Sequence, residues 1–403
     1  MLPQALPVLH QIPNKTWMPR LAITPHSSAP RGDTLVVIFL RGAADVLNMV
    51  VPHGEEAYYR LRPSLGVPRP DDSRKKKDER VIDLNGFFGF HPSMYALTDA
   101  WVSNQLAVIH ACGAPDESRS HFKAMELMER GVDDERGPAS GWIGRHLATL
   151  DTGNLSPLRA VGMGTRPQRS LSGNVPVSAL RSIADFHLGG DQRALQQMRA
   201  ALSTVYEDDA MGQDTLSIMD TLQKLDLNTY QSRMHYPDSE FGLALKQTAM
   251  LIKADVGLEV SAIDVGGWDT HFAQGSINGL MPNLMQDLAE GMAAFHADMQ
   301  EHMKQLTIVT VSEFGRRASE NGSLGTDHGH GSMMMVMGGN VNGGKIHGEW
   351  PGLGEGQLVG SGDLAVTTDY RDVLSEILMK RLNNPAVNEI FPNYQVKIPD
   401  VIV

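Results

Sequence analysis

Short apolar runs rich in β-branched residues recur along this chain, with polar loops and amphipathic segments between them. The clearest runs are TLVVIFL (34–40), LAVIHACG (106–113), LEVSAIDV (258–265) and LTIVTV (306–311). Continuous apolar runs of this length are typical of parallel strands that are buried on both faces. Helical periodicity lies between them, as in SHFKAMELMERG (120–131). This alternation predicts an α/β fold, with a mostly parallel central sheet and helices on both faces.

The length of 403 residues is enough for a large core, and we expect one main domain. Residues 1–33 are rich in proline and predict an irregular N-terminal arm. Residues 34–403 are expected to form the single domain, with a polar helical insertion near 192–247. No run of about 18 apolar residues occurs, so the sequence predicts no membrane span.

The charge and the cysteine content narrow the partners and the type of metal site. The net charge of −12 argues against nucleic-acid binding, since a phosphate backbone favours basic surfaces. Cys112 is the single cysteine, which excludes a disulfide within the chain and a cysteine-based zinc site. We therefore expect a small-molecule substrate as the partner, and oxygen and nitrogen ligands for any metal.

Four loops carry the side chains that are suited to chemistry. Each follows one of the four apolar runs, and ligands of open α/β sheets bind beyond the C-terminal ends of the strands. Asp45 follows the first run, Ala114–His121 the second, Gly266–His271 the third and Glu313–His330 the fourth. If all four runs lie in one sheet, these loops share one edge and can form one site.

Aspartate and histidine in these loops are ligand types that suit Zn²⁺ or Mn²⁺. Glycines beside them, such as Gly266, Gly267, Gly329 and Gly331, allow the tight turns that bring neighbouring side chains together. The same residue types are common in ordinary surface loops. Residue type alone therefore leaves a metal site and a plain polar loop as the two interpretations.

Ser120 stands at the expected start of a helix, and Ser118 is two residues before it. A serine at this position commonly caps the helix. It can also be a nucleophile, because the positive end of a helix favours an alkoxide and an approaching anion. Arg316 and Arg41 are suited to holding the anionic oxygens of a substrate or to forming structural ion pairs. For Glu313 the interpretations are a metal ligand, a residue that orients a histidine and a member of a buried salt bridge, and we expect the second.

The order of these parts resembles the alkaline-phosphatase-like superfamily, which includes phosphatases, sulfatases and cofactor-independent phosphoglycerate mutases. The chain more specifically resembles a bacterial family, domain-of-unknown-function family 1501. The motifs that carry this resemblance run from about Leu35 to Leu353. They are IFLRGAADVLNMVVP, SRSHFKAMELMERG, GWIGR, GGWDTH, SEFGR, GTDHGHG and GEWPGL. The resemblance implies an alkaline-phosphatase-like fold.

The resemblance also implies roles for individual residues. The residues carried over are Asp45, Ser120, Asp327 and His328 for one metal position, and Asp269 and His271 for a second. His330 or His347 would complete the second position, and Ser120 would be the nucleophile. The superfamily usually separates its first Asp and His by more than the single residue between Asp269 and His271. The implied cofactor is one or two divalent ions, such as Zn²⁺, Mn²⁺ or Mg²⁺.

The resulting prediction is a metal-dependent hydrolase or transferase that acts on phosphate or sulfate esters. Ser120 would attack the ester, and Arg316 would hold its oxygens. The alternative is a catalytically silent binding or scaffold protein with the same fold. Members of the family usually begin with a twin-arginine export signal, which implies an exported protein. The first residues here contain no apolar stretch of the signal type, so a cytoplasmic location is the other expectation.

Overall fold

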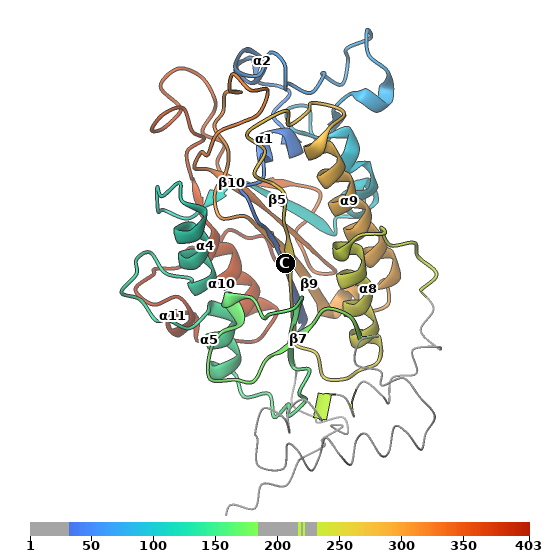
Figure 1. Cartoon of the computed structure of the whole chain (residues 1–403), viewed down its shortest axis with the longest axis vertical. Coiled ribbons are helices and arrows are strands. Elements are labelled where there is room, and N and C mark those ends of the chain that lie inside the picture. The colour runs from blue at the N-terminus through green and yellow to red at the C-terminus, as the bar shows by residue number, and fades with distance from the viewer. Residues whose placement is uncertain (1–31, 184–216, 219–220, 222–231) are drawn as a thin grey trace, which may run out of the picture.

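The computed structural model describes residues 32–183, 217–218, 221 and 232–403, and its centre is a nine-stranded sheet (Figure 1). The strand order is β11-β5-β10-β9-β1-β8-β6-β7, and β12 also pairs with β5. The strands are β1 (Thr34–Leu40), β5 (Leu106–Gly113), β6 (Ala160–Met163), β7 (Ser178–Leu180), β8 (Val260–Val265), β9 (Leu306–Val311), β10 (Ser332–Gly338), β11 (Ile346–His347) and β12 (Thr368–Asp369). The four apolar runs of the sequence thus lie in one sheet.

Strand β1 lies at the middle of the sheet, with a parallel neighbour on each side. Leu35 is in register with Val260 of β8 and with Thr307 of β9. Strands β6 and β7 extend the parallel part beyond β8. The exception is β10, which is antiparallel to both β9 and β5. The sheet is therefore mixed and mostly parallel, which confirms the predicted fold class.

Helices cover both faces of the sheet. In Figure 1, α8 and α9 lie on one side of it, and α4, α5, α10 and α11 lie on the other. The helices are α1 (Val46–Met49), α2 (Glu56–Leu61), α3 (Thr98–Val102), α4 (His121–Arg130), α5 (Trp142–Thr149), α8 (Glu240–Lys253), α9 (Leu280–Asp298), α10 (Tyr370–Lys380) and α11 (Val387–Ile390). A short 3-10 helix, η2 (Pro92–Leu97), precedes α3. A second, small sheet has the order β2-β4-β3, with β2 (Val50–Val51), β3 (Ile82–Asp83) and β4 (Gly89–Phe90).

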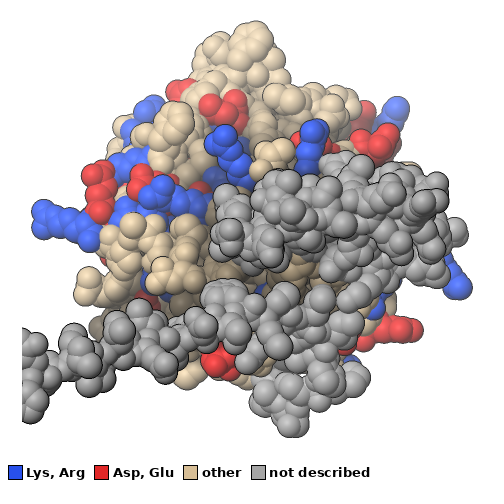
Figure 2. All heavy atoms as spheres, turned by 60° about the horizontal axis from the view of Figure 1, so that its bottom comes forward, with Lys and Arg blue, Asp and Glu red and all other residues tan. Residues whose placement is uncertain are grey.

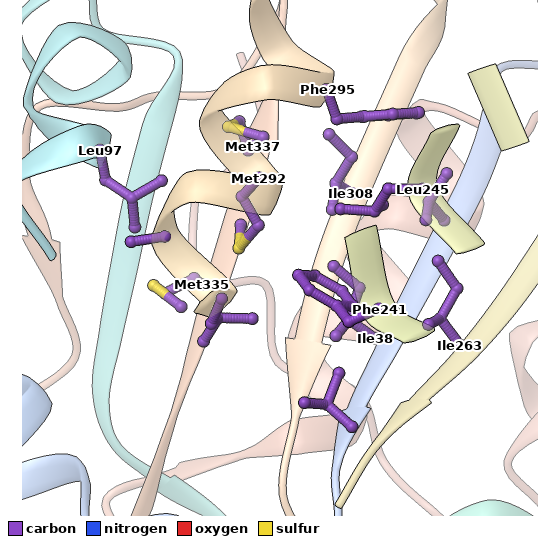
Figure 3. Close-up of a cluster of buried hydrophobic side chains, with 14 of the residues drawn as sticks. Ile38, Leu97, Phe241, Leu245, Ile263, Met292, Phe295, Ile308, Met335 and Met337 are labelled. Carbon is purple, nitrogen blue, oxygen red and sulfur yellow. The ribbon is translucent and has the colours of Figure 1, made fainter. Parts of the chain in front are cut away.

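Alternate residues of β1 pack into two separate cores because successive side chains of a strand point to opposite faces. Ile38 faces the core under α8 and α9, where it packs with Ile263 and Ile308 of the neighbouring strands (Figure 3). Met292 and Phe295 of α9 belong to this core as well. Leu35, Val37 and Phe39 face the other core, with residues of α5 and α10. Burial on both faces explains why β1 is apolar throughout.

The helix that the sequence predicts at 120–131 is present as α4. Helix α4 ends at Gly131, which has the left-handed φ of 65° that commonly ends a helix. The 3-10 helix η2 runs directly into α3, so residues 92–102 form one continuous helical segment. Of the arm predicted at 1–33, only residues 32 and 33 are described, and most of the insertion near 192–247 lies outside the described residues. Of that insertion, the structure describes Glu240–Gln247 as the start of α8.

Charged side chains are mixed on the described part of the end shown in Figure 2, which is the lower end of Figure 1 turned forward. Lysine and arginine lie interspersed with aspartate and glutamate there. No helix in the part of the chain that the structure describes is long and apolar enough to cross a membrane.

Candidate metal centre

The loops that follow β1, β5, β8 and β9 meet at the C-terminal edge of the sheet. The backbone N–H groups of Gly42 and Ala43, after β1, donate to Glu313 Oε1, after β9, at 2.8 and 3.1 Å. His121, after β5, contacts the same carboxylate through Nδ1 at 2.7 Å. His271, after β8, lies 2.9 Å from His328 of the β9 loop, measured between their Nε2 atoms. Because β10 is antiparallel to β9, the loop that joins them begins and ends at this edge of the sheet. Both ends of that loop therefore lie at the site.

Three imidazoles and one carboxylate converge where these loops meet. His328 Nε2 lies 2.9 Å from His121 Nε2 and 2.9 Å from His271 Nε2. Asp269 Oδ1 lies 3.0 Å from His271 Nε2, 3.2 Å from His328 Nε2 and 3.5 Å from His121 Nε2. Among the described residues, the ligand atoms of His121, Asp269 and His328 all lie within 4.8 Å of one another. We call His121, Asp269, His271 and His328 the histidine–aspartate cluster.

The partners of the Nδ1 atoms determine the tautomers of the three histidines. The contacts are His121 Nδ1 to Glu313 Oε1 at 2.7 Å, His271 Nδ1 to Asp327 Oδ1 at 3.2 Å, and His328 Nδ1 to the Arg119 carbonyl oxygen at 2.8 Å. Carboxylate and carbonyl oxygens accept hydrogen bonds, so each Nδ1 has an acceptor for its proton, which favours the tautomer protonated at Nδ1. A neutral imidazole protonated at Nδ1 has a lone pair on Nε2.

Three lone pairs and a carboxylate oxygen therefore face one another, and a bound cation stabilises such an arrangement. Histidine ligands of metals commonly donate their other N–H group to a carboxylate or a backbone carbonyl, as all three do here. A set of nitrogen and oxygen donors without cysteine suits Zn²⁺ or Mn²⁺. The donor set thus fits a divalent metal ion by its chemistry.

The cluster is open to solvent on one side. The side chains of His121 and His328 are 19% and 21% exposed, whereas those of His271 and Asp269 are 41% and 47% exposed. A small molecule can therefore reach Asp269 and His271 from outside. The protein covers the other side.

Arg316 supports the cluster from beneath. Its side chain is fully buried and donates to Asp269 Oδ1 from Nη2 at 2.6 Å. The remaining contacts of the guanidinium go to the carbonyl oxygens of Gly42, Ala43, Trp268 and Thr326. Burial alone would raise the pKa of Asp269, but the hydrogen bond and the positive charge of Arg316 outweigh it and lower this pKa to about 2. The carboxylate is thus held ionised for a cation.

Glu313 fixes His121 and the turn after β1 together. Its carboxylate is buried and accepts from two backbone N–H groups as well as from His121, and the bond to His121 raises the pKa of that imidazole. The turn needs a residue without Cβ at Gly42, whose φ is 115° and whose Cβ would lie 2.6 Å from the Asp269 nitrogen. Ala43 also has a positive φ, of 58°. Glu313 orients a histidine, as the sequence predicts.

Ser120 is the residue immediately before α4, and it is exposed. Its side chain makes no capping hydrogen bond, whereas Ser118 Oγ accepts from the Ser120 N–H group at 3.3 Å. On either side of Ser120, the Arg119 carbonyl binds His328 and the His121 ring belongs to the cluster. The backbone of Ser120 is thereby anchored at the cluster.

Several residues predicted for the site lie apart from the cluster. Asp45 is fully buried, and its Oδ2 accepts from Arg62 and from Gln274 at 2.6 Å each. Asp327 contacts Asn321 and His271 Nδ1, which together lower the pKa of Asp327, so it orients the His271 ring. Arg316 points its guanidinium at backbone carbonyls and Asp269, which places it away from a substrate's oxygens.

Two further histidines and a second arginine that the sequence suggested for the site are also outside the cluster. His330 is half-buried beside Asp116, Glu117 and Asp363, and its burial lowers its pKa. His347 is in the edge strand β11, where its Nε2 contacts the Asn342 carbonyl oxygen at 2.8 Å. Arg41 pairs with Glu129 and Asp264.

Sequence reasoning missed His121, the residue that bridges Glu313 and His328. The signal for it was its position, since it ends the loop after β5 and directly follows the serine of SRSH. A histidine at the start of an amphipathic helix has an ordinary structural interpretation. Only its two ring contacts, to Glu313 and to His328, distinguish it from that interpretation.

The fold and the site define an α/β protein with a histidine–aspartate cluster at the C-terminal edge of a mostly parallel sheet. Residues 33–380 match the model of the family described as "Protein of unknown function (DUF1501)", and the chain belongs to that family. This match confirms the family resemblance seen in the motifs. No curated protein matches the sequence.

Solved structures with similarity include members of the alkaline phosphatase superfamily. One is a protein of that superfamily from Vibrio parahaemolyticus, with 8% sequence identity and a TM-score of 0.33. The similarity covers 77% of this chain. The chain spans 61% of the length of that protein. Another is the PsFucS1 sulfatase from Pseudoalteromonas sp., at 10% identity and a TM-score of 0.36, covering 90% of this chain and 70% of the sulfatase. A third is the alkaline phosphatase of the Antarctic bacterium TAB5, with 8% sequence identity and a TM-score of 0.28. The similarity covers 76% of this chain and 91% of the phosphatase.

Proposed function

We propose that this protein is a metal-dependent hydrolase or transferase that acts on phosphate or sulfate esters, with Ser120 as the nucleophile. The observation that carries this proposal is the convergence of three Nε2 lone pairs and the Asp269 carboxylate beside an exposed, uncapped serine. His121, Asp269, His271 and His328 would hold the metal ion. The bound ion would supply positive charge beside the reacting oxygens.

The remaining residues of the site prepare the serine and the ester. Ser120 stands at the N-terminus of the ten-residue α4, where free backbone N–H groups favour negative charge. These groups favour both an ionised Ser120 Oγ and the anionic oxygens of the ester. Arg316 keeps Asp269 ionised and in place, which gives it a positioning role. Glu313, Asp327 and the Arg119 carbonyl orient the three imidazoles.

The reaction begins when Ser120 Oγ loses its proton to solvent and attacks the phosphorus or sulfur atom. A bond forms from Oγ to that atom, and the bond to the ester oxygen breaks. The leaving oxygen takes a proton from water and departs as an alcohol. Water then attacks the seryl ester, which releases phosphate or sulfate and restores the serine hydroxyl; in a transferase, a second alcohol replaces this water.

The test combines metal analysis with turnover of aryl phosphates, aryl phosphodiesters and aryl sulfates. We expect purified protein loaded with Zn²⁺ or Mn²⁺ to turn over one of these classes, and Ser120→Ala to reduce kcat by about 1000-fold or more. Ser118→Ala is the matched control, because Ser118 stands two residues away in the same loop. Ser120→Ala should retain the metal.

The competing function is a binding or scaffold protein that keeps the fold without catalysis. That function would be favoured if the protein binds metal but turns over none of the three substrate classes, and if Ser120→Ala binds metal as the wild type does. Absence of metal binding would remove the basis of both the ester chemistry and the role of the cluster.

A further inference from the structure

The loops that carry the cluster are joined by one buried glutamine, Gln274, which has no exposed surface. Its Oε1 accepts hydrogen bonds from the hydroxyl groups of Thr270 and Thr326, at 2.9 Å each. Thr270 stands between Asp269 and His271 in the chain. Thr326 stands immediately before Asp327 and His328. One side-chain oxygen thus binds both ligand-bearing loops.

The backbone reinforces this junction. The Thr326 N–H group donates to the Thr270 carbonyl oxygen at 3.2 Å, and the Gln274 N–H group donates to the Leu324 carbonyl oxygen at 2.9 Å. The two loops come from β8 and β9, which both pair with β1 and do not pair with each other. The sheet therefore does not fix their relative position directly, and contacts between the loops must do so.

Asp45 fixes which way the Gln274 amide faces. Asp45 Oδ2 lies 2.6 Å from Gln274 Nε2, and a carboxylate accepts, so the amide nitrogen must face Asp45 and Oε1 must face the threonines. Arg62 holds Asp45 through a buried contact of 2.6 Å from Nη1 to Oδ2. Arg62 also donates to the carbonyl oxygens of Arg317 and Ala318, in the loop after β9.

We propose that Gln274 is a positioning residue for the metal centre, and that Asp45 and Arg62 act through it by fixing the orientation of its amide. This inference rests on the proposed metal centre. Gln274 contacts neither the cluster nor a substrate; it sets the separation between the Asp269–His271 loop and the Asp327–His328 loop. The role of Asp45 is then to orient this amide.

The first experiment compares two buried glutamines. Gln274→Met removes the amide while keeping the length of the side chain, and it should weaken Zn²⁺ binding by about 10- to 100-fold, as loss of residues that orient ligands commonly does. Gln247→Met is the matched control. Gln247 is also buried, and its side chain binds the Ile183 N–H group and the Arg181 carbonyl oxygen, which lie outside the loops that carry the cluster. Both variants should lose thermal stability, but only Gln274→Met should lose Zn²⁺ affinity in calorimetric titration.

A charge substitution gives a second variant. Gln274→Glu places two carboxylates side by side at this junction and should weaken Zn²⁺ binding like Gln274→Met.

Hydrogen exchange of the metal-free protein provides a readout that does not depend on Zn²⁺. The Thr326 amide should exchange about 10-fold faster or more in Gln274→Met than in the wild type, because the loops separate more often. Unchanged exchange, or Zn²⁺ affinity equal to that of the wild type, overturns the inference. If the wild type itself binds no ion, the proposed function fails, and the exchange comparison still decides whether Gln274 holds the loops together.

Discussion

The Nε2 atoms of His121 and His328 lie 2.9 Å apart, although 207 positions separate the two residues in the chain. Each ring is held from behind, by the Glu313 carboxylate and by the Arg119 carbonyl respectively. Both nitrogens are acceptors in these tautomers, and two acceptors do not attract each other. A cation bound between the two nitrogens, as in the proposed metal centre, would account for the contact.

Removing one imidazole should remove most of the metal affinity. We expect His328→Asn to weaken Zn²⁺ binding by more than about 100-fold, beyond the effect of losing a residue that orients a ligand. Excess Zn²⁺ should raise the thermal midpoint of the wild type by mass action and leave that of the variant nearly unchanged. His347→Asn is the control, because His347 lies in the edge strand β11. Equal Zn²⁺ stabilisation of His328→Asn and wild type would contradict the metal centre.

Asp327→Asn should weaken metal binding without abolishing it. Asp327 Oδ1 accepts from His271 Nδ1 and from Asn321 Nδ2, so the substitution changes the orientation of one ligand while the cluster keeps all four members. The expected loss of Zn²⁺ affinity is about 10- to 100-fold. Complete loss of binding would instead make Asp327 a direct ligand. Competition titration against a chelator of known affinity distinguishes the two.

Gly42→Ala should disturb the cluster from the turn after β1. A Cβ at Gly42 would lie 2.6 Å from the Asp269 nitrogen, and the φ of 115° is itself unfavourable for alanine. Gly86→Ala is the matched control, since Gly86 has a φ of 82° with nothing within 4 Å of its Cβ. The control should cost about 1–2 kcal/mol for the backbone alone. Gly42→Ala should cost more and should also lower Zn²⁺ affinity, whereas equal effects of the two variants would show that the Asp269 loop yields freely.

Buried histidines should make the protein sensitive to mild acid. Burial lowers the pKa of His110 and of His146 to about 4, below the ordinary value of 6.5. The unfolded chain then binds more protons than the folded one between these pH values, so stability is kept above pH 6.5 and falls as the pH drops toward 4. Each histidine contributes a slope of up to about 1.4 kcal/mol per pH unit in this window.

The measurement is the thermal midpoint between pH 7 and pH 4.5, made on metal-free protein. His110→Phe should flatten the dependence on pH even if the variant is less stable at pH 7, because it loses the hydrogen bond from Nε2 to the Val50 carbonyl oxygen. His235→Phe, at an exposed position, is the control. A slope that is identical in His110→Phe and wild type would contradict the assignment.

The strands were predictable because burial on both faces leaves a continuous apolar run, which β1 and β9 both show. The antiparallel direction of β10 was not, since MMMVMGG is as apolar as a parallel strand. That direction depends on the path of residues 312–331, which return to the edge where they began. Local residue types do not encode such a path.

The site was predictable as a location more than as a set of ligands. Asp269, His271 and His328 lie in the cluster, in loops that the strand pattern identified. The superfamily resemblance implied Asp45 as a metal ligand, but Arg62 and Gln274 bind its carboxylate instead. No local pattern in the sequence indicates that Arg62 pairs with a residue 17 positions before it. Arg316 was expected to hold the oxygens of a substrate, because the sequence does not indicate whether a given arginine is buried.

The central place of β1 also has a consequence for how the chain reaches this structure. Strand β1 is the first strand of the described residues, and it pairs with β8 and β9, whose first partners are some 225 and 270 residues further on. During synthesis β1 therefore has no sheet partner until most of the chain has left the ribosome. Until then β1 remains unpaired in a partly collapsed chain, and unpaired strand edges favour aggregation. Strand pairing over such sequence separations is slow, so expression yield should depend on chaperones and on temperature more than the stability of the finished fold would suggest.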